Sequence, residues 1–172
     1  METLPLSPVD AGGTRVDLKG LTPEELESFV LGLGLKRFRA RQLFEWIHKH
    51  DAASFEACAN LPKADRERLA EHAVIGRLEV ARHQPSMDGT EKFLFGLADG
   101  HEIESVLIPD EDRLTLCISS QVGCALGCGF CLTARMGLIR HLTPGEIVDQ
   151  VYRARAHLGE GRRITNIVFM GM

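Results

Sequence analysis

The chain has 172 residues, of which 44% are hydrophobic and 26% charged, and its formal net charge is −4. This composition is typical of a globular protein and excludes disordered and fibrous classes. The negative charge excludes a polycation that coats nucleic acid, so any RNA contact would come from a local basic patch.

Three helices are predicted in the first 75 residues, which we expect to form a small helical domain. The stretch LTPEELESFVLGLG (21–34) has Thr22 as an N-cap, Pro23 at the first helical position and Glu25 to close a capping box. RARQLFEWIHKH (39–50) repeats the helical period, and a weaker helix is expected over 63–73. The apolar faces comprise Leu26, Phe29, Val30, Leu33, Ala40, Leu43, Phe44 and Ile47.

From Arg77 the apolar period changes to two, which predicts strands. RLEVARHQ (77–84) is followed by TEKFLFGLADGHEIESVLIP (90–109), in which Asp99-Gly100 is a strong hairpin signal. We therefore expect a β-hairpin extension over 76–109. RLTLCIS (113–119) predicts a further strand that leads straight into a cysteine-rich loop.

A strand–loop–helix–strand unit is expected over 110–172. LTPGEIVDQVYRARAHLG (142–159) predicts a capped helix, and ITNIVFMGM (164–172) resembles the apolar strands buried in parallel sheets. A parallel sheet needs more strands than these two, so we expect the chain to be the N-terminal part of a longer protein. The buried side of the helix is expected to carry Ile147, Val148, Val151 and Tyr152.

The chain has five cysteines, and three of them lie in QVGCALGCGFC (121–131). An odd, clustered set predicts metal binding or redox chemistry rather than a disulfide scaffold. At offsets of four and three, Cys124, Cys128 and Cys131 would form an apolar stripe on a helix. Three nearby glycines make a helix costly, by roughly 1 kcal/mol each, so we favour a loop around a metal centre. Cys58 is interpreted as structural.

Three thiolates select zinc, copper or an iron–sulfur group. A zinc site would need a fourth ligand, for which His141 is the best candidate. A four-iron cluster held by three thiolates would leave one iron open to a substrate or cofactor.

The pattern C-x-x-x-C-x-x-C, with Phe130 before its last cysteine, resembles the radical S-adenosylmethionine (SAM) superfamily. LCISSQVGCALGCGFCLTARMGLIRHLTPGEIVDQV (116–151) followed by ITNIVFMGM resembles more closely the RlmN/Cfr family of RNA adenine methyltransferases, and especially its RlmN members. The resemblance runs from about Leu18 to the last residue and is strongest from Glu102 on.

The resemblance implies an α/β fold, in which a helical domain and a β extension precede the truncated start of a (β/α) radical SAM barrel. It implies a [4Fe-4S] cluster on the three loop cysteines, with SAM on the fourth iron. Phe130 would lie beside the adenine of SAM, and Gly171 and Met172 would begin the motif that holds its methionine end. One SAM would methylate a cysteine, and a radical from a second SAM would activate that methyl for attack on C2 of an adenosine in large-subunit ribosomal RNA and transfer RNA.

Two further residues match functional positions of the family. Glu104 matches the carboxylate that accepts the C2 proton, although a glutamate on an alternating strand is usually just solvated. Cys117 matches the cysteine that forms a transient disulfide with the methyl-carrying one. It falls on the opposite strand face from Leu116 and Ile118, so its thiol need not be core; the alternative is a buried small hydrophobe.

The implied partners are ribosomal and transfer RNA and an electron donor such as flavodoxin or ferredoxin, with the protein monomeric. The family carries a helical accessory domain used on RNA, which favours phosphate contacts over a merely solvated helix face for the local basic patch. A transmembrane-length apolar run and a signal peptide are not apparent, so we expect a cytoplasmic protein. The patch comprises Lys36, Arg37, Arg39, Arg41 and Lys49.

Three alternatives remain from the sequence. They are Cfr-like methylation at C8, a different radical SAM enzyme, and a zinc-binding RNA module. The methyl-accepting cysteine and the remaining SAM contacts are expected beyond Met172. We therefore expect this chain alone not to complete a turnover.

Overall fold

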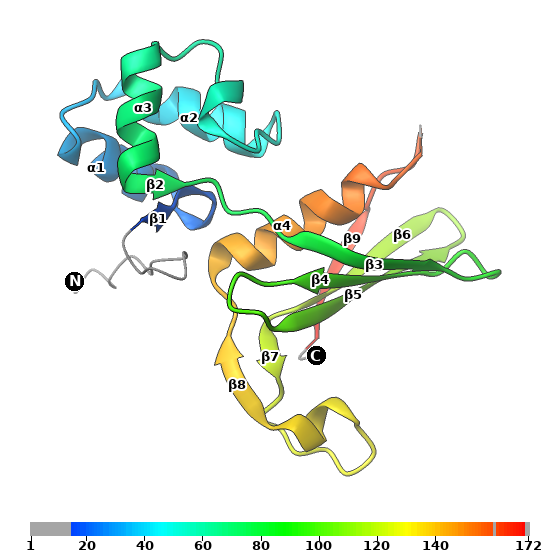
Figure 1. Ribbon diagram of the computed structural model, residues 1–172. Helices are drawn as coiled ribbons and strands as arrows, with labels where there is room; N and C mark the ends of the chain where they lie inside the picture. Colours follow the sequence, from blue (N-terminus) through cyan, green and yellow to red (C-terminus); the bar gives the residue numbers. More distant parts are fainter. Residues whose placement is uncertain (1–14, 160, 171–172) are drawn as a thin grey trace. The chain divides into compact units, whose positions relative to one another are not determined.

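The computed structural model describes residues 15–159 and 161–170. It divides into two compact units, one ending at Arg77 and the other beginning at Leu78, each with its own hydrophobic core (Figure 1). We call them the helical unit and the sheet unit. None of the described helices combines the length and the apolar character needed to span a membrane.

The helical unit contains the helices that the sequence predicts. They are α1 (Pro23–Gly32), α2 (Phe38–His48) and α3 (Lys63–His72), with short 3₁₀ helices at Leu18–Gly20 and Phe55–Ala57. A parallel pair of two-residue strands, β1 (Val16–Asp17) and β2 (Ala73–Val74), joins the two ends of the unit.

Helix α1 begins where its cap predicts. The Thr22 hydroxyl accepts a hydrogen bond from the Glu25 N–H, and the Glu25 carboxylate accepts one from the Thr22 N–H. The predicted apolar faces of α1 and α2 form the core together with Cys58, which is fully buried. Burial raises the pKa of the Cys58 thiol to about 11, which suits a structural residue.

The sheet unit is built on one five-stranded sheet in the order β3-β4-β5-β6-β9. All neighbours are antiparallel except β6 and β9, which run parallel and are connected through α4 (Pro144–Ala156). The predicted hairpin at Asp99-Gly100 joins β4 to β5, with Gly100 at a φ of 84°. The strands are β3 (Glu79–Pro85), β4 (Glu91–Gly96), β5 (Glu102–Asp110), β6 (Arg113–Ser119) and β9 (Asn166–Met170).

The sheet contains both segments that were predicted to be separate from the sequence, the β-hairpin extension (76–109) and the unit over 110–172. Strands β5 and β6 are hydrogen-bonded neighbours, with Val106 opposite Cys117 and Leu107 opposite Leu116. Residues 76–109 are therefore an integral part of the sheet that includes 110–172, because a tight antiparallel turn connects β5 to β6.

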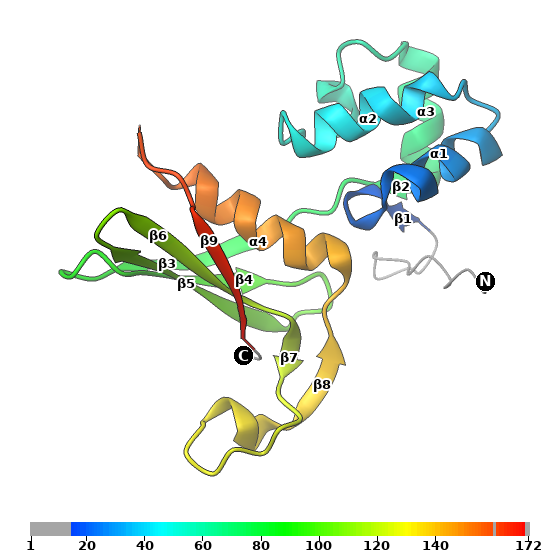
Figure 2. The same cartoon turned by 180° about the vertical axis from the view of Figure 1, so that it is seen from behind.

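The two faces of this sheet have different surroundings. Helix α4 packs on one face, where alternate residues such as Phe93, Leu107 and Leu116 form the core (Figures 1 and 2). The register places the intervening residues on the other face, which we call the open face. It carries Arg82, Lys92, Leu94, Glu104, Val106, Cys117, Val168 and Met170.

A short hairpin that the sequence did not predict lies between β6 and α4. Strands β7 (Gln121–Gly123) and β8 (Leu138–His141) pair antiparallel and hold the cysteine loop, residues 124–137, at their ends. The expectation that β6 leads straight into the loop was therefore wrong. Strands of three and four residues are too short to show an alternating pattern, so only pairing reveals them.

Helix α4 confirms its predicted buried side in part, since Ile147 and Val151 pack against the core of the sheet unit. Its most buried side chains include Glu146, Asp149, Gln150 and Arg153, while the four predicted apolar residues are only half-buried. Two of these polar side chains are buried with hydrogen-bond partners. Gln150 Oε1 accepts from the Ser119 N–H of β6 at 2.8 Å, and Asp149 Oδ2 accepts from the N–H of Leu78, just before β3, at 2.6 Å.

Strand β9 pairs parallel with β6 as expected, but it is not buried. All five of its residues are exposed, including Phe169 at 63% and Met170 at 50%. The reason is its place in the sheet: β9 is an edge strand, and within the described residues its other edge has no neighbour.

Candidate functional site

The cysteine loop is closed at its base by backbone contacts that require glycine. Gly123 has a φ of 74°, and a Cβ at this position would collide with the Gly137 carbonyl oxygen. The next residue, Cys124, donates its N–H to that same carbonyl at 3.0 Å. A side chain at position 123 would therefore disturb the base from which Cys124 is presented.

Arg140 of β8 ties this base to two other parts of the sheet unit. Its Nε bonds Asp99 Oδ2 at 2.6 Å, and Nη1 and Nη2 bond the Glu146 carboxylate at 2.9 and 2.8 Å. Glu146 Oε2 also accepts the Thr143 N–H in the capping box of α4. These bonds raise the pKa of Arg140 and lower that of Asp99. The loop base, the β4–β5 turn and the start of α4 are thus joined by one guanidinium.

The three loop cysteines are free thiols in unequal surroundings. Cys124 is buried, whereas Cys128 and Cys131 are half-buried. The Leu126 N–H points at the Cys124 sulfur at 3.5 Å. Hydrogen bonds from backbone N–H groups, that of Ala134 first, lower the pKa of Cys131. Backbone donors that stabilise thiolate favour a metal-binding role over that of an inert thiol.

Three thiols with backbone donors suit a soft metal or an iron–sulfur group. The described ranges, 15–159 and 161–170, contain no group of three His, Cys, Asp or Glu side chains arranged to hold a metal ion. The fit therefore rests on donor chemistry. His141, the candidate fourth zinc ligand, lies at the far end of the β7–β8 hairpin, where its Nδ1 is 3.2 Å from Gln121 Nε2.

The apolar side chains of the loop point into solvent. Phe130 is 95% exposed, and its neighbours Leu126 and Leu132 are 82% and 76% exposed. The predicted contact of Phe130 with adenine stays a prediction. Gly171 and Met172 lie outside the described residues.

Glu104 and Cys117 lie together on the open face of the sheet. Cys117 is directly opposite Val106, so Glu104 is one same-face position along β5 from its partner. The Ser119 hydroxyl, at the end of β6, donates to the Glu104 carbonyl oxygen at 2.7 Å. Because β7 begins at Gln121, Glu104 lies at the end of the sheet where the hairpin of the cysteine loop departs.

The two side chains differ in exposure and charge environment. Cys117 is 4% exposed, and burial raises the pKa of its thiol, although it does not belong to the apolar cluster under α4. The Glu104 side chain is 39% exposed and its Oε1 pairs with Lys92 Nζ at 2.6 Å. Lys92 was not predicted from the sequence, because its alternating position indicates which face it occupies but not its partner on the neighbouring strand.

The chain is similar to known proteins along most of its length. Residues 16–75 match the family described as "Ribosomal RNA large subunit methyltransferase N-terminal domain". The "Dual-specificity RNA methyltransferase RlmN" of Anaeromyxobacter dehalogenans is 54% identical over 162 residues, and that of Geotalea uraniireducens is 51% identical over 158. The chain belongs to the RlmN family. These alignments cover 91% and 92% of this chain and 44% and 45% of the two relatives.

A solved structure supports the same conclusion. A radical SAM methyltransferase from Sphaerobacter thermophilus superposes with a TM-score of 0.80 at 46% sequence identity, over 91% of this chain and 46% of the other. The chain thus spans less than half the length of these two RlmN relatives and of the Sphaerobacter thermophilus protein.

In this RlmN-family chain the basic patch of the helical unit is largely paired. Arg39 is a structural residue: its side chain is 15% exposed, its Nε pairs with Asp65 at 2.9 Å and its Nη1 bonds Gln42. The side chains of Arg37 and Arg41 are 77% and 86% exposed. Arg37 forms an ion pair with Glu27, and Arg41 forms one with Glu45. Within the expected basic patch, Arg39 therefore serves the packing of the helical unit and is not exposed for binding.

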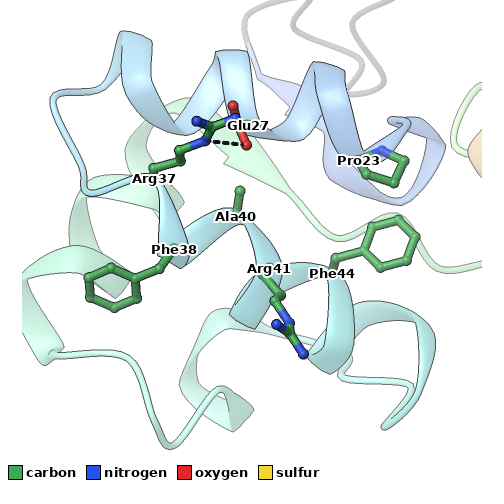
Figure 3. Close-up of a pocket in the computed structure, with 7 residues that line it drawn as sticks. All are labelled: Pro23, Glu27, Arg37, Phe38, Ala40, Arg41 and Phe44. Carbon is green, nitrogen blue, oxygen red and sulfur yellow. Dashed lines mark ion pairs between the residues drawn. The ribbon is translucent and has the colours of Figure 1, made fainter.

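Arg37 and Arg41 also border a pocket between α1 and α2 (Figure 3). The pocket has a volume of about 570 Å³, and Arg37 is joined to Glu27 across it at 2.9 Å. A hydrogen bond from Arg37 to that carboxylate raises the pKa of the arginine. The lining residues are Pro23, Glu27, Arg37, Phe38, Ala40, Arg41 and Phe44.

Proposed function

We propose that this chain is part of a radical SAM methyltransferase that methylates C2 of adenosine in large-subunit ribosomal RNA and in transfer RNA. The observation that carries the proposal is the meeting of two groups of residues at one end of the sheet. The glycine-based cysteine loop departs next to the strand positions that hold Glu104 and Cys117. Family membership supports RNA as the substrate.

The sheet unit is proposed to be the start of a (β/α) barrel. Strand β6, helix α4 and strand β9 form a parallel crossover in which the helix covers one face of the sheet. In such a barrel α4 would lie on the outside and the open face would line the interior. The exposed β9 edge is where a further parallel strand would pair.

Cys124, Cys128 and Cys131 are proposed to hold a [4Fe-4S] cluster, with SAM bound beside it by Phe130, Gly171 and Met172. When bound, this group supplies the single electron for radical chemistry at a carbon that lacks an acidic proton. The chain contributes backbone N–H donors to two of these sulfurs, from Leu126 to Cys124 and from Ala134 to Cys131. It also contributes Arg140, whose hydrogen bonds to Asp99 and Glu146 hold the base of the loop in place.

On the open face, Glu104 is proposed to accept the proton that C2 loses when the methyl group is added. Its side chain is 39% exposed on the open face, so a nucleobase can reach it. Cys117 is proposed to form a transient disulfide with the cysteine that carries the methyl group: the Cys117 thiol gives up its proton and its sulfur attacks the sulfur of that cysteine, the bond from that sulfur to the transferred carbon breaks, and the electron pair of that bond stays with the RNA. The Cys117 thiol lies on the open face, in the cross-strand row next to Glu104.

The helical unit is proposed to contact RNA phosphates through the exposed members of the basic patch. Exposed ion pairs are worth roughly 0–1 kcal/mol, so Arg37 and Arg41 can exchange their glutamates for phosphate at little cost. Lys36 and Lys49 are exposed and have no ion-pair partner among the described residues. We further propose a cytoplasmic monomer that takes electrons from a flavodoxin or ferredoxin.

The metal content of the chain tests the proposal. Anaerobic reconstitution with iron and sulfide should give about four irons and four sulfides per chain. Cys128→Ser should lose them, while Cys58→Ser, which changes a core thiol, should retain them. One zinc and no sulfide would contradict the cluster. In the full-length protein, mass spectrometry of modified RNA should find methyl at C2; methyl at C8 would overturn the assignment of the target atom.

Arginine substitution tests the RNA contact. Replacing Arg37 and Arg41 together by glutamine should weaken RNA binding and reduce the slope of log K against log salt by roughly 0.7–0.9 for each lost phosphate contact. Arg113→Gln, which breaks an exposed ion pair in the sheet unit, is the matched control. An unchanged slope would contradict the contact.

A further inference from the structure

On the open face, an ion pair with Lys92 gives the two carboxylate oxygens of Glu104 different surroundings. Oε1 lies 2.6 Å from Lys92 Nζ. Oε2 has no partner among the residues that the structure describes. One oxygen is thus held from the neighbouring strand, and the other remains available to a substrate.

The strand register explains why Lys92 can reach. Leu94 is directly opposite Glu104, and Lys92 is directly opposite Val106, so lysine and glutamate are diagonal neighbours on one face. Diagonal same-face neighbours are within reach of a long side chain. The same cross-strand row continues from Lys92 through Val106 to Cys117. Lys92 is therefore a diagonal neighbour of Glu104, and Val106 of β5 separates it from Cys117.

A glutamate without such a partner would sample several rotamers. Its side chain has three rotatable bonds, and at 39% exposure packing alone does not hold it. The side chains of Lys92 and Glu104 are both partly exposed, so the pair adds less than about 1 kcal/mol to folding. A short contact that contributes so little to stability is better placed to orient a carboxylate than to hold the sheet together.

We propose that Lys92 is a positioning residue for the proposed reaction, holding Glu104 by Oε1 so that Oε2 receives the proton from C2 of adenosine. This rests on the proposed function, since it assumes that Glu104 is the proton acceptor. In the step, the C2–H bond breaks heterolytically, the proton moves to Oε2, and the bonding electron pair stays on the RNA adduct. Glu104 becomes a neutral acid that still accepts a hydrogen bond from Lys92.

The test uses the full-length reconstituted protein and an RNA deuterated at C2 of the target adenosine. Lys92→Met should lower kcat about tenfold to a hundredfold with KM little changed, because a misplaced base slows the chemical step. The kinetic isotope effect at C2 should increase, since C–H cleavage becomes more rate-limiting. Lys92→Arg, which keeps a donor cation, should recover most of kcat.

Two control variants separate the possible failures. Arg113→Met breaks the exposed Arg113–Asp110 pair of the same sheet, 2.7 Å long, and should leave kcat and the isotope effect unchanged. Glu104→Gln should abolish methylation; if it does not, the proposed role of Glu104 fails. If Glu104→Gln is inactive but Lys92→Met matches the wild type, the positioning role of Lys92 alone is overturned. The positioning role would also be overturned if Lys92→Met lowered kcat without increasing the isotope effect and Lys92→Arg did not recover kcat.

Discussion

The helical unit and the sheet unit bury their side chains in different ways. In the helical unit the apolar faces of short helices meet in one core, and its exposed large apolar side chains among the described residues are Leu31 and Phe38. The sheet unit buries one face of its sheet under α4 but exposes β9, much of the cysteine loop and part of the open face. Residues proposed to carry the chemistry lie in the less completely buried unit, where a substrate can reach them.

Core truncation should have the largest effect and should be similar in both units. Leu43→Ala in α2 and Leu116→Ala in β6 each remove a fully buried side chain, and each should cost about 2–5 kcal/mol of unfolding free energy. Urea denaturation followed by far-UV circular dichroism would measure the loss. Leu31→Ala, at a side chain 49% exposed, is the control and should cost far less. A small cost for Leu116→Ala would contradict a packed core in the sheet unit.

Removal of the Arg140 tie should have the next largest effect, confined to the sheet unit. Arg140→Met leaves Glu146, which is 8% exposed, without its ion partner and should cost about 2–3 kcal/mol. Arg113→Met removes an exposed pair and should cost less than about 1 kcal/mol. Equal losses in the two variants would show that the tie is no more than a surface pair.

The same tie predicts a pH dependence. Arg140 lowers the pKa of Asp99 in the folded state, so the unfolded chain takes up the proton first as the pH falls. The stability from this pair is complete above the ordinary aspartate pKa of about 4 and is lost as the pH falls through the lowered value. Stability measured from pH 6 downward should fall more steeply in the wild type than in Arg140→Met. Parallel curves would contradict the coupling.

Thiol reactivity should distinguish the two units in the metal-free chain. The pKa of Cys58 is raised to about 11 by burial, so only about one thiol in a thousand is ionised at pH 8. The pKa of Cys131 is lowered by backbone donors. Iodoacetamide should therefore modify Cys131 at least about tenfold faster than Cys58, as read by peptide mass spectrometry. Equal rates would contradict the stabilised thiolate; a urea-unfolded sample, in which the rates should converge, is the control.

Phe130 should give the smallest effect on stability. Its side chain is 95% exposed, so Phe130→Ala should change the unfolding free energy by less than about 0.5 kcal/mol. SAM binding to the reconstituted full-length protein should nevertheless weaken if the ring contacts adenine. Unchanged SAM affinity, measured by calorimetry, would remove Phe130 from the proposed site. Leu132→Ala, at a loop side chain 76% exposed, is the matched control.

Local signals predicted much of the fold because they act within a few residues. The capping boxes at Thr22 and Thr143 mark the starts of α1 and α4, and Asp99-Gly100 marks the β4–β5 turn. Strand alternation likewise predicted that Cys117 turns away from Leu116. These features depend on backbone hydrogen bonding and side-chain period, both of which can be read from neighbouring residues.

Features that depend on pairing between distant segments were not predicted. The β7–β8 hairpin holds the cysteine loop at its end. Gln150 of α4 accepts a hydrogen bond from Ser119 of β6, which lies 31 positions earlier in the sequence. The Lys92–Glu104 pair likewise depends on the register of two strands. No local period encodes such contacts.

The amino-acid sequence by itself determined the helices, the strand alternation and the three-cysteine loop with its glycines, since these follow from local conformational preference and ligand chemistry. Only the tertiary structure decided that Glu104, Cys117 and Lys92 share one face beside the base of that loop. The reason is that strand register and the packing of α4 are chosen by the total free energy of the sheet unit, in which distant residues contribute together.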